Sequence, residues 1–241
     1  MKRILLTAAI LTAATMSYAQ PRYECHRATG PILIDGILSE ASWQTAPESG
    51  QFKDIRGEQW PEQPTMQTTF KMLYDDTYLY IGGIIRETDI RGSLTEHDSI
   101  IYHDNDFEVF IDPYDEGRFY YELEFNALGT VMDLLMTKPY REDGNYLMNW
   151  DCTGLQIKTS YDGTLNDSSD TDKAWYIEIA IPLNSLDRRS KKLSEQKVWR
   201  MNFSRVEWLK KGGPEENWVW APTGIVDIHI PAKWGYVDFV Y

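Results

Sequence analysis

The sequence predicts an all-β protein, specifically an antiparallel β-sandwich with one or two short helices, and three observations support this fold class. Short segments alternate between apolar and polar residues, which is typical of strands with one buried face. Turns rich in Gly, Pro and Asp separate these segments, as they do in sandwiches. Helical periodicity is weak, and no expected helix is long enough to cross over a sheet.

The clearest strand is expected at 106–112, where Phe107, Val109 and Ile111 alternate with polar residues. A turn at 113–117 follows, and then a second alternating strand at 119–126. A hairpin is expected around Asp75-Asp76. The two strands of this hairpin are expected at 68–74 and 78–85. The remaining strands of the fold are expected at 131–136, 155–160, 175–181, 198–208, 218–220 and 234–241. One short helix is expected at 39–45, with Ser39 as its N-cap.

Three glutamates share a sheet face if the strands at 106–112 and 119–126 pair: Glu108, Glu122 and Glu124. Two facing carboxylates are what glycoside hydrolysis requires, whereas a solvated polar face is the plainer interpretation of the same pattern. The sequence contains no Gly-x-Ser-x-Gly elbow and no phosphate-binding glycine loop. Enzymatic activity therefore stays open, and a binding function is favoured.

The charge of the chain limits its partners. The 241 residues include 24 Lys+Arg and 37 Asp+Glu, which gives a net charge of −13. Such a surface repels phosphate groups, so nucleic acid and anionic membranes are not expected as partners. We expect a monomer.

The first 19 residues have the pattern of a secretory signal peptide. A basic start is followed by an uncharged apolar run and by Ser17-Tyr18-Ala19, a small-residue cleavage site. The expected organisation is a signal peptide at 1–19 and one domain at 20–241, in a secreted or periplasmic protein. In such a compartment, Cys25 and Cys152 either pair in a disulfide or serve as two small buried hydrophobic residues.

Ligands for a metal ion are concentrated in residues 96–106. Carboxylates at Asp98, Asp104 and Asp106 suit calcium, which takes six to eight oxygen ligands, and they are the candidate ligands of a structural Ca²⁺. The spacing of His97 and His103 does not match a zinc site, and Asp-rich turns are also common in acidic exported proteins without any metal.

Aromatic residues are abundant, with nine Trp, fifteen Tyr and eight Phe. Most are expected in the core, but Trp60, Tyr102 and Tyr140 stand among polar neighbours. Exposed aromatic faces stack on the apolar faces of sugar rings, while nearby acids and amides bind the hydroxyl groups. The composition therefore favours a carbohydrate ligand.

Four segments in order along the chain resemble the family 9 carbohydrate-binding modules, particularly secreted single-domain bacterial relatives. They are 34–43 (IDGILSEASW), 73–81 (LYDDTYLYI), 104–112 (DNDFEVFID) and 175–182 (WYIEIAIP), with KWGY at 233–236. The resemblance implies an immunoglobulin-like or jelly-roll sandwich, often stabilised by calcium, that binds sugars and supports glycan breakdown.

The same resemblance implies a sugar held between two tryptophans. Tyr102 stands at the first of these positions, whereas the stretch 228–231 (IHIP) at the second contains no tryptophan. Trp60 or Trp220 would have to replace it. The resemblance carries over the polar ligands Glu108, Glu122 and Arg205.

The sequence leaves two alternative functions open. One is a hydrolase of O-glycosyl compounds. The other is a haem- or metal-binding sandwich, for which Met132, Met136, Met148 and four histidines are candidate ligands without a spacing that singles out an axial pair.

Overall fold

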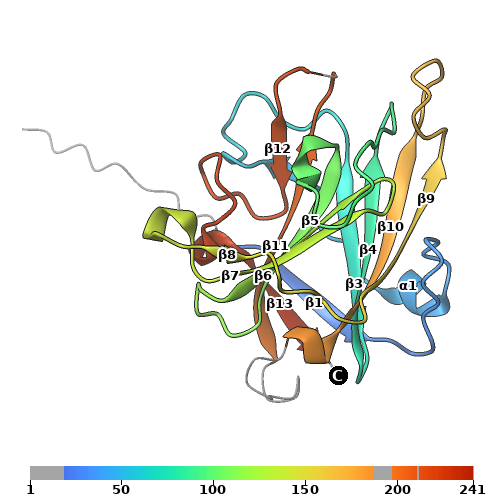
Figure 1. Cartoon of the computed structure of the whole chain (residues 1–241). Helices are drawn as coiled ribbons and strands as arrows, with labels where there is room; N and C mark the ends of the chain where they lie inside the picture. The colour runs from blue at the N-terminus through green and yellow to red at the C-terminus, as the bar shows by residue number, and fades with distance from the viewer. Residues whose placement is uncertain (1–18, 187–196, 211, 241) are drawn as a thin grey trace, which may run out of the picture.

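The computed structural model describes residues 19–186, 197–210 and 212–240, and within them the strands form a single sheet (Figure 1). The strands are β1 (Arg22–Arg27), β2 (Lys53–Asp54), β3 (Thr68–Tyr74), β4 (Tyr78–Arg86), β5 (Asp106–Asp112), β6 (Tyr120–Asn126), β7 (Val131–Met136), β8 (Tyr146–Leu147), β9 (Gln156–Asp162), β10 (Ala174–Pro182), β11 (Val198–Glu207), β12 (Glu216–Val219) and β13 (Gly235–Val240). The short helices are α1 (Ala41–Thr45) and the 3-10 turns η1 (Ile101–His103), η2 (Tyr140–Glu142), η3 (Leu183–Leu186) and η4 (Pro231–Lys233).

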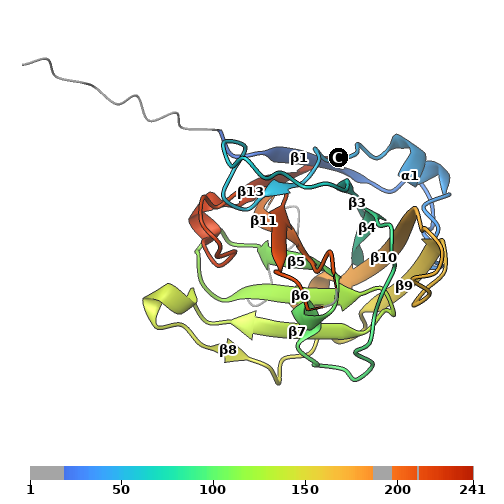
Figure 2. The same ribbon diagram turned by 90° about the horizontal axis from the view of Figure 1, so that it is seen from above.

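The sheet runs in the order β8-β7-β6-β5-β11-β13-β1-β3-β4-β10-β9, and β12 pairs with both β11 and β2. Viewed from above, it curls so that its two ends enclose an interior (Figure 2). The expectation of a mostly β, sandwich-like fold with few short helices is confirmed. The sheet is mixed, however, because β1 pairs in parallel with β13 and with β3.

Each strand expected from the alternation is present, with bounds that shift by a few residues. The sequence did not predict β1, β2 or β8, two of which are only two residues long. The expectation that Ser39 caps the helix is wrong. The helix begins at Ala41 with Glu40 as its N-cap, and the Glu40 side chain instead accepts a hydrogen bond from the backbone N–H of Leu33 at 3.0 Å.

The core lies where the two halves of the curled sheet meet. The rings of Phe70 on β3 and Phe203 on β11 stack with their centroids 3.7 Å apart. Phe107 on β5 packs near Phe203 at 6.1 Å and reaches the backbone of Gly83 on β4, where a Cβ would lie 3.4 Å from its ring. Because these contacts join β3 and β4 to β5 and β11, the sheet is closed by packing against itself.

Cys25 and Cys152 both lie in this core as buried, free thiols. In this structure they serve as small hydrophobic residues, the second of the two expectations for them.

A buried carboxylate links the segments 34–43 and 175–182 in the structure. Glu178 on β10 accepts hydrogen bonds from the backbone N–H groups of Asp35 and Gly36, each at 3.0 Å, and from Trp43 Nε1 at 2.9 Å. Gly36 has a φ of 85° and passes so close to Thr159 that a Cβ would lie 3.0 Å from its carbonyl carbon. Glycine is therefore required at this turn.

The expected leader at 1–19 lies outside the described residues, apart from Ala19. Among the residues that the structure describes, no helix has the length and apolar character needed to cross a bilayer.

Phe107→Ala is expected to lower the free energy of unfolding by about 3–5 kcal/mol, because it removes a fully buried ring from the centre of the core. Chemical denaturation monitored by tryptophan fluorescence would measure this loss. A loss under about 1 kcal/mol, the range of a surface substitution, would contradict the packing described here.

Candidate functional site

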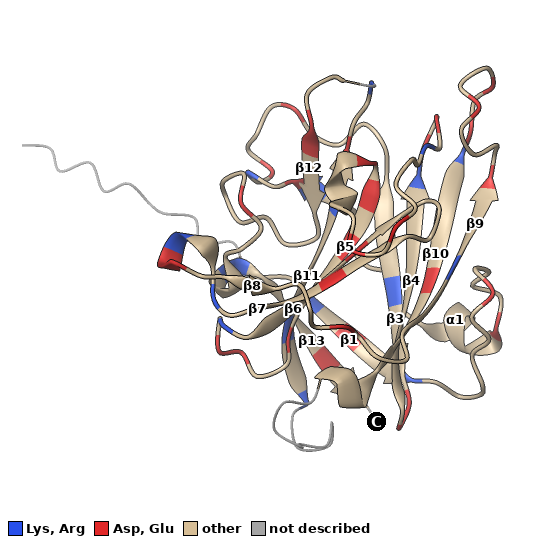
Figure 3. Cartoon of the chain, in the orientation of Figure 1, with Lys and Arg blue, Asp and Glu red and all other residues tan. Residues whose placement is uncertain are grey.

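The face of β5 and β6 opposite the core carries the glutamates that the sequence placed together. Glu108 pairs in register with Glu124, and Phe110 pairs with Glu122. These three glutamates are all buried, with exposed fractions of 5% or less, so the face is not a solvated surface. Figure 3 shows acidic residues on β5 and beside it.

These glutamates line a pocket of about 400 Å³, which we call the Tyr102 pocket. Its walls come from segments far apart in the chain: Ile100 and Tyr102 around η1, Met132 and Leu134 on β7, Tyr140 of η2, Tyr146 of β8 with Met148, Ser204 and Val206 on β11, Glu215 with Asn217 on β12, and Ile228 with His229 before η4. Tyr102, Tyr140 and Tyr146 are 40–49% exposed. The pocket therefore combines accessible aromatic rings with buried carboxyl groups.

Hydrogen bonds hold Tyr102 in place at the pocket. Its backbone N–H donates to Glu124 Oε2 at 3.2 Å, and its carbonyl oxygen accepts from Trp208 Nε1 at 2.9 Å. Both bonds use the backbone, so the ring of Tyr102 remains available for a ligand.

Burial sets the protonation of the acidic cluster. Desolvation raises the pKa of Glu108 to about 7, although hydrogen bonds with Ser204 and Asp106 oppose this shift. Desolvation and the nearby Glu108 charge raise the pKa of Glu122 to about 8. The pKa values of Asp106 and Glu124 are raised well above their usual range by the same causes. Near neutral pH the cluster therefore retains protons and contains both donors and acceptors of hydrogen bonds.

The stretch before η4, where the sequence places no tryptophan, does reach this pocket through Ile228 and His229. His229 Nδ1 and the Tyr120 hydroxyl form a hydrogen bond at 3.0 Å. Burial lowers the pKa of His229 to about 4, so its imidazole is neutral near pH 7. The ring of Tyr140 lies 4.7 Å from that of His229. The segment from η2 to β8 thus supplies two tyrosines, Tyr140 and Tyr146, to this pocket. Of these, only Tyr140 was singled out in the sequence, because its neighbours are polar.

Three of the six expected binding residues, Tyr102, Glu108 and Glu122, meet in the Tyr102 pocket, and Arg205 does not. Strand alternation is the reason: Ser204 and Val206 line the pocket, so Arg205 between them points the other way and is fully buried. Its guanidinium is held by Glu87 and Glu207, at 2.7 and 2.5 Å.

The two expected tryptophans also lie elsewhere. Trp220 is only 5% exposed and lines a separate pocket of about 570 Å³ with Arg56, Gln59 and other residues. Trp60 lies in the adjoining loop, and the Arg56 guanidinium covers its ring at 3.7 Å. Neither tryptophan lines the Tyr102 pocket.

The three expected calcium ligands do not form one set. Both Asp104 oxygens are occupied by the backbone N–H groups of Ser93 and Leu94, the Ser93 hydroxyl and the Asn126 amide. Asp106 belongs to the buried glutamate cluster, whereas Asp98 lies beside His97 and Asp133. These three carboxylates therefore do not form one shared calcium site.

The stability of the protein is expected to fall as the pH rises from about 5 to 8. Glu108 and Glu122 keep their protons in the folded state up to pH values near 7 and 8, whereas the unfolded chain releases them near 4.5. Each unit of pKa difference corresponds to about 1.4 kcal/mol, so raising the pH through this window favours unfolding.

Glu122→Gln should therefore reduce this pH dependence and stabilise the protein by about 1–3 kcal/mol at pH 8, since it removes one buried ionisation. Denaturation curves at several pH values would measure the effect, with the exposed Glu142→Gln as the matched control. An unchanged slope in the Glu122 variant would contradict the burial argument.

Comparison with solved structures finds the same fold in ten chains, and three of them illustrate how low the sequence identity is. A candidate carbohydrate-binding protein from Bacteroides uniformis superposes with a TM-score of 0.68 at 14% identity, covering 92% of this chain and all of that chain. A family 9 carbohydrate-binding module from Caldicellulosiruptor kristjanssonii, in complex with cellotriose, gives 0.62 at 16% identity, with 91% and 93% covered. The same organism's family 9 module in complex with glucose gives 0.61 at 16%, with 90% and 95% covered.

No curated protein sequence matches the chain. Residues 34–240 match the family described as carbohydrate family 9 binding domain-like, which spans the segments 34–43, 73–81, 104–112 and 175–182 and nearly all of the sheet. The chain therefore belongs to the carbohydrate family 9 binding domain-like family.

Proposed function

We propose that this protein binds a poly- or oligosaccharide in the Tyr102 pocket. The observation that carries the proposal is the combination of exposed tyrosines with buried carboxyl groups in one pocket of a family 9 fold. Aromatic faces suit the apolar faces of sugar rings, and polar groups that both donate and accept suit hydroxyls. The sugar complexes of two structural relatives support the same ligand class.

The volume and lining of the pocket suit a short stretch of a glycan. About 400 Å³ lies in the range of pockets that bind small ligands. Because Ile228 and His229 stand where the family resemblance places a second tryptophan, the sugar would stack on tyrosines and not between two indoles. Ser204, Asn217 and the glutamates would bind its hydroxyl groups.

The same proposal includes export and a supporting role in glycan breakdown. The basic start, the apolar run and Ser17-Tyr18-Ala19 support secretion or delivery to the periplasm. There, a binding protein would hold glycan near the enzymes that degrade it.

Tyr102→Ala is expected to weaken glycan binding by about 1–3 kcal/mol, the range for losing an aromatic anchor, while the fold is retained because the ring is 40% exposed. A glycan array would identify the ligand, and calorimetry would give the affinities.

Glu108→Gln should also weaken binding at pH 8, by about 1.5–3 kcal/mol, because it removes charge-assisted hydrogen bonds to hydroxyls.

The matched control is Tyr161→Ala, which removes a similarly exposed tyrosine on β9 and should leave the affinity unchanged. If Tyr102→Ala binds like the parent and Trp60→Ala does not, the ligand occupies the pocket beside Trp220 instead. Release of reducing sugar from the bound glycan would support the hydrolase alternative.

Export predicts a new N-terminus at Gln20 in protein recovered from the native host. Cleavage after Ala19 follows from the small residues at Ser17 and Ala19, and N-terminal sequencing or mass spectrometry would detect it. Intact Met1 on soluble cytoplasmic protein would be the contrary result.

A further inference from the structure

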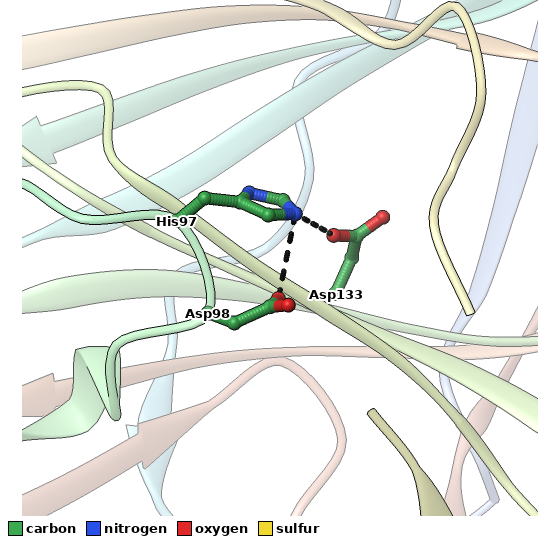
Figure 4. A group of neighbouring side chains, drawn as sticks. All are labelled: His97, Asp98 and Asp133. Atoms are coloured by element: carbon green, nitrogen blue, oxygen red, sulfur yellow. Dashed lines mark ion pairs between the residues drawn. The ribbon is translucent and has the colours of Figure 1, made fainter. Parts of the chain in front are cut away.

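A second cluster of polar side chains lies on the side of β7 that faces away from the Tyr102 pocket. Met132 and Leu134 line the pocket, so strand alternation directs Asp133 to the other side. There Asp133 meets His97 and Asp98 from the loop before η1 (Figure 4). His97 Nε2 lies 3.3 Å from Asp133 Oδ1 and 3.4 Å from Asp98 Oδ1. Asp151, from the segment after β8, places its Oδ1 3.4 Å from the same nitrogen.

Two carboxylate oxygens of this cluster are buried without accepting a hydrogen bond. They are Asp133 Oδ1 and Asp98 Oδ1, and both point at His97 Nε2 (Figure 4). Asp133 is only 1% exposed, and its other oxygen accepts a hydrogen bond from the Cys152 backbone N–H at 2.5 Å. Buried polar atoms rarely lack a hydrogen bond, so these two oxygens, which His97 meets by ion pairs, point to a further ligand.

Charge balance indicates a cation. Three carboxylates surround one imidazole, and even a protonated His97 would balance only one of them. A monovalent partner therefore leaves the cluster negative, whereas a divalent cation bound by the neutral imidazole and two or three carboxylates compensates it.

The backbone already holds the ligands in position. The N–H of Asp98 donates to the carbonyl of Val131 on β7 at 2.9 Å, which fixes the loop against the strand that carries Asp133. Asp98 has a φ of 62°, a left-handed conformation uncommon for residues other than glycine. The site is thus assembled from three segments and is not a run of acids in one loop.

Ligand chemistry selects the class of metal. Calcium and magnesium prefer oxygen ligands alone, whereas imidazole suits zinc and other first-row transition metals. Tetrahedral coordination at about 2.0–2.1 Å separates neighbouring ligand atoms by about 3.3 Å. The distances from His97 Nε2 to the Asp98 and Asp133 oxygens match this separation, and the ligand atoms of these three residues all lie within 4.8 Å of one another.

We infer that His97, Asp98 and Asp133 form a binding site for a zinc-class divalent cation, with a water molecule, or Asp151 after a movement of its exposed side chain, as the fourth ligand. The cation would join the loop before η1, strand β7 and the segment after β8. Because η1 carries Tyr102, the metal would also stabilise one wall of the Tyr102 pocket. The inference does not depend on the proposed carbohydrate ligand.

The test uses tag-free protein treated with EDTA, dialysed and titrated with ZnCl₂ in a calorimeter. We expect one zinc ion per chain, a higher melting temperature with zinc, and no displacement by a large excess of Ca²⁺ or Mg²⁺. His97→Gln should weaken zinc binding by at least about 10-fold. Its side chain is 54% exposed, so this variant should fold.

Two further variants make the result decisive. His26→Gln removes another partly exposed imidazole, which lies 3.7 Å from one carboxylate on β1, and should bind zinc like the parent. Asp151→Asn changes a carboxylate that is 64% exposed and should weaken binding less than His97→Gln, because a water molecule can replace it.

Three results would overturn the inference. The first is the absence of stoichiometric zinc binding by the parent. The second is an affinity that His97→Gln and His26→Gln change equally, which indicates adventitious surface binding. The third is displacement of zinc by calcium, which would show that the metal class is wrong.

Discussion

The arrangement of the Tyr102 pocket depends on one buried cation, the guanidinium of Arg205. It is fully buried and forms ion pairs with Glu87 and Glu207, while it also donates to the carbonyl of Arg86 at 2.8 Å. Asn105 donates to both glutamates, at 3.2 and 2.9 Å. Burying these charges is tolerated only while all partners remain in place, because removing one leaves an uncompensated charge. The end of β4, strand β11 and the segment before β5 are therefore held in a single arrangement.

A continuous path of hydrogen bonds connects this network to the pocket wall. Asn105 Oδ1 accepts from the backbone N–H of Trp208 at 2.9 Å, and Trp208 Nε1 donates to the carbonyl of Tyr102. The N–H of Tyr102 in turn reaches Glu124 on the pocket floor. A ring positioned in this way before the ligand arrives reduces the ordering cost of binding. Arg205, which the family resemblance suggested as a ligand, instead holds together the segments from which this path begins.

Strand alternation predicted most of what lies on β5 and β6, and it also shows why Arg205 was misplaced. The period of two correctly put Glu108 and Glu124 on one face, and the same period applied to β11 separates Arg205 from its neighbours Ser204 and Val206. Pairings between distant segments carry no such local signal. The parallel neighbours of β1, and the arrival of Tyr146 at the pocket from β8, depend on how the whole sheet curls. The second carboxylate cluster at His97 likewise joins three separate segments.

The acidic cluster at the Tyr102 pocket lowers the stability of the fold, and its place at a candidate binding site accounts for this energetic cost. Four acids lie side by side out of water, and the pKa values of all of them are raised because ionisation there is unfavourable. A sheet selected for stability alone would carry apolar residues at Glu108, Glu122 and Glu124, as it does at Phe107 and Leu123 on the other face. Departures of this kind are expected at functional sites. A carboxyl group that holds its proton near neutral pH both donates and accepts hydrogen bonds, as a sugar hydroxyl does. The burial that raises the pKa values of these carboxyl groups is thus the same property that makes the pocket suited to hydroxyl groups.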